Sequence, residues 1–220
     1  MTLKIGKCEI YDDDYPKLLK YIHNPPRQLY YHGNFRDIDF NKCISIVGSR
    51  VHSKDAEFLV RELIEFLAPK NISVVSGLAS GIDTLVHREC LNNSIRTLAV
   101  MPMGLLKITP QSNKDLYWEI INKRGLCISE DCQVEEYNKY LFPRRNRIIA
   151  GLSRVTIVIE AGIKSGALIT ADLAFNENRT VFAYPGSPLN HFSMGTNMLI
   201  KELKANMLID LNEIMQDYGF

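Results

Sequence analysis

The sequence predicts an α/β protein with a doubly wound, mostly parallel sheet of the extended Rossmann-like type and a short N-terminal lead-in. Two observations lead to this fold class. From Cys43 onwards, short apolar runs alternate with longer segments whose apolar residues recur at helical spacing. The apolar runs are nearly continuous, which is typical of strands that helices bury on both faces. We therefore expect parallel strands joined by right-handed crossovers.

Six apolar runs predict the central strands, and a seventh predicts a short strand at the edge of the sheet. In chain order they are Cys43–Val47, Ser73–Ser76, Thr97–Met101, Leu126–Ser129, Val155–Glu160, Thr180–Tyr184 and Met207–Asp210. Helices are expected at Lys54–Ala68, Gly81–Leu91, Lys114–Lys123, Arg144–Leu152, Gly166–Asn176 and Thr196–Leu203. Ser53 and Thr196 are the expected N-caps.

Residues 1–40 differ in composition from the rest and are expected to form a lead-in that packs on a core domain of residues 41–220. The paired prolines Pro25 and Pro26 stop helical structure, so a helix is expected only over about Tyr15–Ile22.

Composition narrows the classes of function. The chain has 220 residues and a formal net charge of +1, so a nucleic-acid site must come from a local cluster of basic residues. No apolar run is long enough to cross a bilayer and no signal core is visible, so we expect a cytoplasmic protein without membrane attachment. The five cysteines form no CxxC pair and are expected to be reduced, buried thiols. Neither a metal site nor a cofactor is expected.

Open parallel sheets bind ligands at the carboxyl ends of their strands. Gly48-Ser49-Arg50 follows the first strand and leads to a helix start, which is a natural anion site. Ser76, Gly77 and Gly81 follow the second strand and suit close approach of a phosphate. An ordinary turn with a solvated arginine remains the alternative at Arg50.

Two side chains on the second helix are expected to pair with each other. Asp83 lies in the first turn, where the helix dipole favours a carboxylate. His87 follows four residues later on the same face, and pairing with Asp83 is favoured over catalysis.

A basic cluster, Arg144-Arg145-Asn146-Arg147, begins the helix before the fifth strand. Positive charge at a helix N-terminus opposes the helix dipole unless an anion compensates it, so we expect a phosphate site there. A solvated basic turn, or a salt bridge to a carboxylate such as Glu130 or Glu160, is the alternative. Ser165 and Gly166 open a further helix and provide another expected anion site. Glu160 ends a buried strand and is expected to have a partner.

These turns resemble those of the DNA-processing protein A (DprA/Smf) family, in the family's order and over nearly the whole chain. The motifs that carry the resemblance are Tyr15-Pro16, Pro25-Pro26, Gly48-Ser49-Arg50, Ser76-Gly77-Leu78-Ala79 with Gly81-Ile82-Asp83 and His87, Ser129-Glu130, the segment 142–153, Glu160-Ala161 with Ser165-Gly166, Pro185-Gly186, and Gly195 with Asn197, Leu199 and Ile200.

The resemblance implies a non-enzymatic protein that binds single-stranded DNA, forms homodimers, protects incoming DNA and hands it to the RecA recombinase in natural transformation. It also implies that Arg50 and the segment Phe142–Arg147 contact DNA. Two departures are visible. The loop Gly104–Pro110 lacks the family's usual Gly-Leu/Ile-Asp and Tyr-Pro pattern, and the chain has no room for the additional helical or winged-helix-like domains that many members carry.

Two other functions remain open. One is an enzyme of the related Rossmann-like superfamily that cleaves nucleotide N-glycosidic bonds. The segment Ser165–Thr170 lacks the Gly-Gly-x-Gly-Thr sequence and the following glutamate of those enzymes. The other is a sensor that binds a small nucleotide without turnover.

Overall fold

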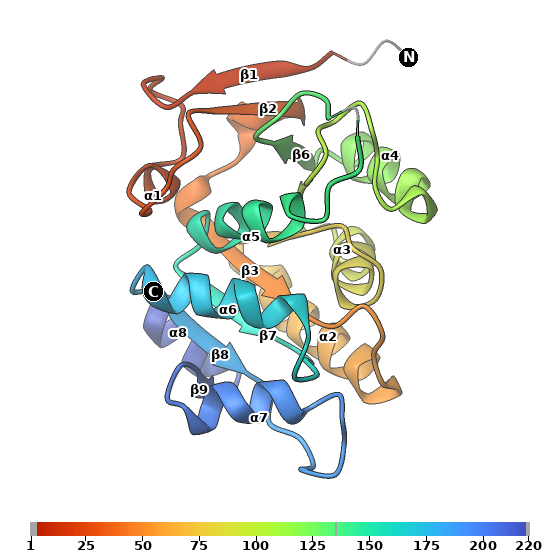
Figure 1. Cartoon of the computed structure of the whole chain (residues 1–220), viewed down its shortest axis with the longest axis vertical. Helices are drawn as coiled ribbons and strands as arrows, with labels where there is room; N and C mark the ends of the chain where they lie inside the picture. Colours follow the sequence, from red (N-terminus) through yellow and green to blue (C-terminus); the bar gives the residue numbers. More distant parts are fainter. Residues whose placement is uncertain (1–3, 135, 219–220) are drawn as a thin grey trace.

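Within residues 4–134 and 136–218, which the computed structural model describes, nine strands form one sheet that runs down the long axis of the molecule (Figure 1). Their order is β1-β2-β6-β5-β4-β3-β7-β8-β9. The strands are β1 (Gly6–Glu9), β2 (Gln28–Gly33), β3 (Cys43–Val47), β4 (Ser73–Ser76), β5 (Thr97–Val100), β6 (Leu126–Ser129), β7 (Val155–Val158), β8 (Thr180–Ala183) and β9 (Asn206–Met207).

The sheet is doubly wound and mostly parallel, which confirms the predicted fold class. From β3 the chain builds outward through β4, β5 and β6, then returns to the other side of β3 and adds β7, β8 and β9. All pairings among these seven strands are parallel. The strand order therefore reverses between β3 and β7, and such a switch point is where an open sheet leaves room for a ligand.

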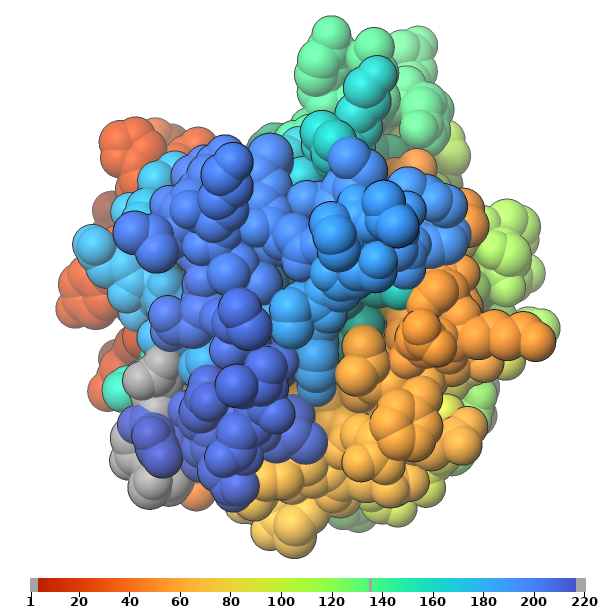
Figure 2. All heavy atoms as spheres, turned by 90° about the horizontal axis from the view of Figure 1, so that it is seen from below, coloured from red at the N-terminus to blue at the C-terminus, as the bar shows by residue number. Residues whose placement is uncertain are grey.

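Helices cover both faces of the sheet. They are α1 (Lys17–Lys20), α2 (Lys54–Leu67), α3 (Ile82–Asn92), α4 (Lys114–Asn122), α5 (Leu141–Gly151), α6 (Gly166–Asn176), α7 (Met194–Lys201) and α8 (Asn212–Tyr218). Apolar side chains of α2, α3, α4 and α8 are buried against one face, and those of α1, α5, α6 and α7 against the other. Figure 2, which views the molecule from its β9 end, shows the blue C-terminal elements beside the orange start of α2.

The longest helix illustrates how the sequence specifies these layers. Ser53 caps α2, as predicted, because its hydroxyl accepts a hydrogen bond from the amide of Ala56 at 3.3 Å. Two acidic residues in the first turn suit the positive end of the helix dipole. Its buried residues recur at helical spacing and form one stripe against the sheet: Ala56, Val60, Leu63, Ile64 and Leu67.

The lead-in differs from its prediction, because it contributes two strands that the sequence analysis did not anticipate. β2 pairs with β6, and β1 pairs with β2, both antiparallel. The strand β2 buries Leu29 and His32 while Tyr30 and Tyr31 remain half-buried. Its sequence therefore lacks the continuous apolar run that is typical of a strand buried on both faces. The helix of the lead-in is limited to Lys17–Lys20.

Several predicted boundaries also differ. Helix α5 begins at Leu141, three residues before the expected start, and α8 was not predicted. Helix α7 begins at Met194, so Thr196 lies inside it and is not its N-cap; the Thr196 hydroxyl donates to the backbone oxygen of Ser193 at 3.0 Å. The expected edge strand Met207–Asp210 is a two-residue strand, Asn206–Met207.

Four of the five cysteines are buried free thiols, and Cys132 is half-buried. Among the described residues, no helix has both the length and the apolar character that crossing a membrane requires.

Candidate functional site

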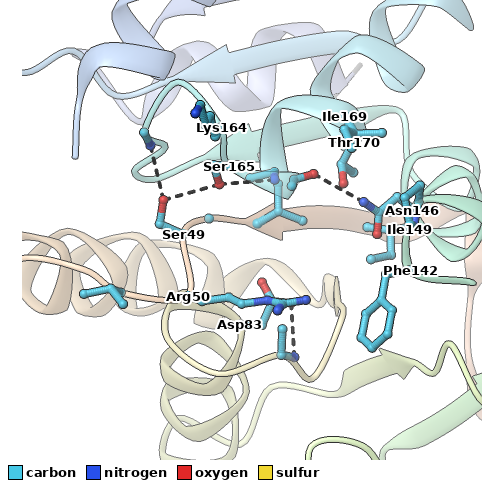
Figure 3. Close-up of a pocket in the computed structure, with 18 of the residues that line it drawn as sticks. Ser49, Arg50, Asp83, Phe142, Asn146, Ile149, Lys164, Ser165, Ile169 and Thr170 are labelled. Carbon is cyan, nitrogen blue, oxygen red and sulfur yellow. Dashed lines mark hydrogen bonds between the residues drawn. The ribbon is translucent and has the colours of Figure 1, made fainter. Parts of the chain in front are cut away.

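A cleft of about 780 Å³ lies at the carboxyl ends of β3 and β7, at the switch point of the sheet. One wall comes from the turn after β3, and another comes from the turn after β7 and the start of α6. The first turn of α5 closes the cleft on a third side. Figure 3 shows side chains from these three segments pointing into a common space.

The turn after β3 is joined to the turn after β7 by hydroxyl contacts (Figure 3). The Ser49 hydroxyl donates to the Ser165 hydroxyl at 3.3 Å and accepts from the amide of Gly162 at 3.3 Å. Gly48 has no room for a side chain, because a Cβ there would lie 2.5 Å from Ile82. These contacts fix the two walls of the cleft relative to each other.

Arg50 is exposed at the mouth of the cleft. Its guanidinium carbon lies 5.4 Å from the centre of the Phe142 ring, which is a cation–π distance. Within the described part of the chain, Arg50 forms no ion pair. Its charge is therefore available to an anion.

The turn after β4 builds the floor of the cleft and does not offer its hydroxyl to a ligand. Ser76 is fully buried, and its hydroxyl donates to the backbone oxygen of Ile46 at 2.7 Å, so the expected phosphate contact from Ser76 is not possible in this arrangement. Gly81 has a positive φ of 81°, and a Cβ there would lie 2.4 Å from the Ser49 carbonyl oxygen. The glycine is needed for this close approach of backbones.

The basic cluster at the start of α5 is divided, and two of its arginines form salt bridges. Arg144 lies 3.0 Å from Glu130 and 3.2 Å from Asp131, and Arg147 lies 2.5 Å from Glu130. Neither lines the cleft. The salt bridge to Glu130 that the sequence left as an alternative is therefore present, and it explains how positive charge is tolerated at this helix start.

Arg145 lines the cleft wall but is directed into the protein, with 6% of its surface exposed. Its guanidinium donates to the backbone oxygens of Gly77, at 2.6 Å, and Val100. Its Nε donates to Asn146 Oδ1 at 3.1 Å. Burial lowers the pKa of Arg145 to about 10, although the charge of Asp83 opposes that decrease.

The predicted pairing of Asp83 with His87 is wrong. Asp83 is buried and accepts a hydrogen bond from the amide of Ala79 at 3.3 Å. Burial raises the pKa of the Asp83 carboxyl, and the neighbouring Arg145 guanidinium opposes that rise. His87 has a different partner, because its Nδ1 lies 2.6 Å from the Thr97 hydroxyl.

At this edge of the sheet, the starts of α2 and α3 already hold a carboxylate. Glu160 accepts from the Ser53 amide at 2.9 Å and from the Ser53 hydroxyl at 2.5 Å, so it occupies the start of α2 and has the partner that was expected. Asp83 lies in the first turn of α3. At α6 the cap is the uncharged Ser165, which accepts from the amide of Ala167 at 3.3 Å. Gly166 beside it is exposed, and a Cβ there would meet nothing within 4 Å.

Several lining residues escaped the sequence analysis. Lys164 and Lys139 are exposed cations on the cleft, and within residues 4–134 and 136–218 neither forms an ion pair. Two aromatic pairs flank the cleft: Tyr137 with Phe142, whose ring centres are 5.9 Å apart, and His191 with Phe192, at 3.9 Å. The position of Lys164 directly before Ser165-Gly166 was a signal that could have been used. The other missed residues lie in irregular segments without a sequence pattern: Tyr137, Lys139, His191 and Phe192. Phe142, in contrast, lies in α5 and begins the segment Phe142–Arg147 that the resemblance implied.

No cluster of potential metal ligands occurs among the residues that the structure describes. As far as the described residues go, the site combines three cations without acidic partners, an open helix start and flanking aromatic rings. Together with the fold, these features define a Rossmann-like protein with a basic cleft at the switch point of its sheet.

Comparison with known proteins identifies the family. Residues 7–219 match the family model described as DNA recombination-mediator protein A, and the chain belongs to this family, DprA/Smf. The DNA processing protein DprA of Streptococcus pneumoniae is 41% identical over 217 residues, which are 99% of this chain and 76% of the relative. Its crystal structure superposes with a TM-score of 0.88, at 39% identity, and the match covers 99% of this chain and 75% of that one.

Two further relatives extend the comparison. Protein Smf of Synechocystis is 40% identical over 211 residues, or 94% of this chain, and the chain spans 52% of that relative's length. The structure of DNA processing protein A from Helicobacter pylori matches with a TM-score of 0.87 at 28% identity, and the match covers 99% of this chain and 98% of that one.

Proposed function

We propose that this protein is a recombination mediator that binds single-stranded DNA in the cleft between β3 and β7 and makes or breaks no covalent bond. The observation that carries the proposal is the open start of α6 with unpaired cations beside it. The Helicobacter pylori relative was described with a single-stranded DNA binding mode, and it supports the choice of ligand.

The phosphates of the strand are assigned to the mouth of the cleft. The backbone amide of Gly166 lies in the first turn of α6, and such an amide together with the helix dipole attracts an anion. Lys164 and Arg50 supply positive charge on two sides, and the Arg50 guanidinium can hold two phosphate oxygens at once. Ser49 and Ser165 place two hydroxyls between them.

The bases are assigned to the apolar surfaces of the same cleft. Phe142 and Ile149 of α5 and Ile169 of α6 line the cleft, and the ring pair His191 and Phe192 lines it as well. Aromatic rings stack on unpaired bases of any sequence, whereas a duplex keeps its bases stacked inside. Single strands are therefore the preferred ligand.

The wider role follows from the family. We propose that the protein acts in the cytoplasm as a homodimer, protects incoming single strands and delivers them to the RecA recombinase during natural transformation. The matching family is described as recombination mediators, which supports this role. We also propose that residues 41–220 form the DNA-binding core and that residues 1–40 are an addition to it.

A pair of substitutions at Gly166 tests the site. Gly166→Asp places a carboxylate at an open helix start, where it favours the helix by about 0.3–1 kcal/mol and repels a phosphate. Gly166→Asn adds a side chain of the same shape without the charge. We expect both variants to retain the wild-type melting temperature or exceed it, and only Gly166→Asp to lose affinity for oligothymidine, by about tenfold.

The assay is fluorescence anisotropy with labelled oligothymidine, an equal-length duplex and a panel of mononucleotides, with product release scored in parallel. Equal affinity of the two Gly166 variants for oligothymidine would show that no phosphate binds at the start of α6. Equal affinity for duplex and single strand would argue for a generic basic surface. Tight mononucleotide binding without oligothymidine binding would favour a nucleotide sensor, and released base would favour an N-glycosidic enzyme.

A further inference from the structure

Two buried charged residues meet at the cleft from opposite faces of the sheet. Asp83 belongs to α3, which packs on one face, and Arg145 belongs to α5, which packs on the other. Each has only 6% of its surface exposed. The backbone of Gly77 lies beside both, because a Cβ on Gly77 would come within 2.6 Å of Asp83 Oδ2 and 2.6 Å of Arg145 Nη2.

The guanidinium of Arg145 connects the ends of two neighbouring strands. Its Nη1 donates to the carbonyl oxygen of Gly77, which follows β4, and to that of Val100, which ends β5. Asp83 holds the same turn from the other face, because its Oδ2 accepts from the amide of Ala79 at 3.3 Å. Together the two side chains fix the turn that forms the floor of the cleft.

The contacts continue from Arg145 to the proposed phosphate site. Arg145 Nε donates to Asn146 Oδ1 at 3.1 Å, and Asn146 Nδ2 donates to the backbone oxygen of Gly166 at 3.3 Å (Figure 3). Asn146 is itself buried, with 8% of its surface exposed. A series of contacts therefore runs from α3 to the turn after β4, from that turn to α5, and from α5 to the start of α6.

The charge of Arg145 has its partner inside the protein. Burial of an unpaired guanidinium costs several kcal/mol, and a nearby carboxylate offsets that cost. Asp83 is the nearby carboxylate: it lies across Gly77 from the guanidinium, and its charge favours the charged form of Arg145. Three donor contacts of Arg145 go to oxygens of the protein. Arg50, Lys139 and Lys164, in contrast, are exposed on the same cleft.

We propose that Arg145 and Asp83 are a positioning pair, which holds the floor of the cleft and the start of α6 in the relative positions that DNA binding requires. Arg145 itself does not contact a phosphate. This inference rests on the proposed binding of single-stranded DNA in the cleft. It assigns Asp83 a role in affinity although its charge has the same sign as the ligand.

Asp83→Asn separates positioning from direct phosphate contact, because the two predict opposite results. If Arg145 contacted phosphate directly, removal of the neighbouring carboxylate would free its charge and strengthen binding. If the pair positions the cleft, the same change weakens binding. The matched control is Asp115→Asn, which neutralises an exposed first-turn aspartate on α4, away from the cleft.

We expect Asp83→Asn to bind oligothymidine about tenfold more weakly than the wild type, or about 1.4 kcal/mol, measured by fluorescence anisotropy well below the melting temperature. The slope of log affinity against log salt concentration should stay unchanged, because the number of phosphates contacted is the same. Asp115→Asn should bind like the wild type. Wild-type or tighter binding by Asp83→Asn, or a slope smaller in magnitude by about 0.7, overturns the inference.

Gly77→Ala is the second variant, and it tests the positioning role if Asp83→Asn does not fold. It leaves every charge in place, but its Cβ would force Arg145 and Asp83 away from their observed positions. Weaker binding with an unchanged salt slope supports the positioning role, and wild-type affinity overturns it. A wild-type protein that does not bind oligothymidine refutes the proposed function, whereas a binding wild type with a fully active Asp83→Asn refutes this inference alone.

Discussion

His87 is a fully buried histidine that stays neutral in the folded protein at neutral and mildly acidic pH. The Thr97 hydroxyl donates to the backbone oxygen of Val74 at 3.1 Å, so it accepts from His87, and Nδ1 of His87 is assigned the proton. Nε2 is buried and has no hydrogen-bond partner. Burial, assisted by the charge of Arg145, lowers the pKa of His87 to about 3.

The consequence is a defined loss of stability in mild acid. In the unfolded chain a histidine titrates near pH 6.5, so below that pH only the unfolded state gains a proton at this position. The stability is fully present above about pH 6.5 and is lost as the pH falls towards 3. Between pH 7.5 and pH 5 the loss from His87 amounts to about 2 kcal/mol, because only the roughly 1.5 pH units below 6.5 contribute and each corresponds to about 1.36 kcal/mol.

The assay compares chemical denaturation of the wild type and His87→Gln at several pH values from 7.5 to 5. Glutamine can still donate to Thr97 but does not titrate, so the variant should be less stable at pH 7.5 and should lack about 2 kcal/mol of the acid-dependent loss. Titration of the carboxylates is common to both proteins and cancels in the difference. Parallel pH profiles for the two proteins would refute the assignment of a neutral, buried His87.

Two further changes probe the cleft. Arg50→Lys keeps the charge but loses the planar guanidinium fork. Loss of a charge-assisted hydrogen bond of about 1.5–3 kcal/mol should weaken oligothymidine binding by about ten- to hundredfold. The control is Arg61→Lys, exposed on α2, and equal anisotropy titrations of the two variants would show that Arg50 is only a solvated turn residue. Glu160→Gln loses one of its two acceptor oxygens for Ser53, so thermal denaturation should show a lower melting temperature while DNA binding persists; base release by the wild type that this variant loses would indicate an enzyme.

Periodicity and strand-end rules were sufficient to predict most of the core. Strands β3, β4 and β6 have the predicted bounds because each is a short, continuously apolar run that both helical layers bury. Strands β1 and β2 were missed because an antiparallel edge pair exposes part of each strand and carries a mixed sequence. The two-residue strand β9 is too short for any pattern to define its bounds.

The site was predicted less completely than the fold, for a physical reason. A local pattern places Arg144, Arg145 and Arg147 together at a helix start, but it does not show which carboxylates the rest of the chain brings there. Glu130 forms salt bridges with two of these arginines, and the charge of Asp83, from a helix on the opposite face of the sheet, favours the charged form of the third. Cations such as Lys139 lie in loops, and only the three-dimensional structure shows that these loops line the cleft.

The contact between Ser49 and Ser165 also has a consequence during synthesis of the chain. These two hydroxyls are 116 residues apart in sequence, and they belong to the two halves of the doubly wound sheet. A nascent chain that has produced only the first half holds Arg50 but lacks the facing wall and the start of α6. We therefore expect the cleft to be completed late in translation, when the second half has docked on β3, so that a ribosome-bound first half should not retain a nucleic-acid strand.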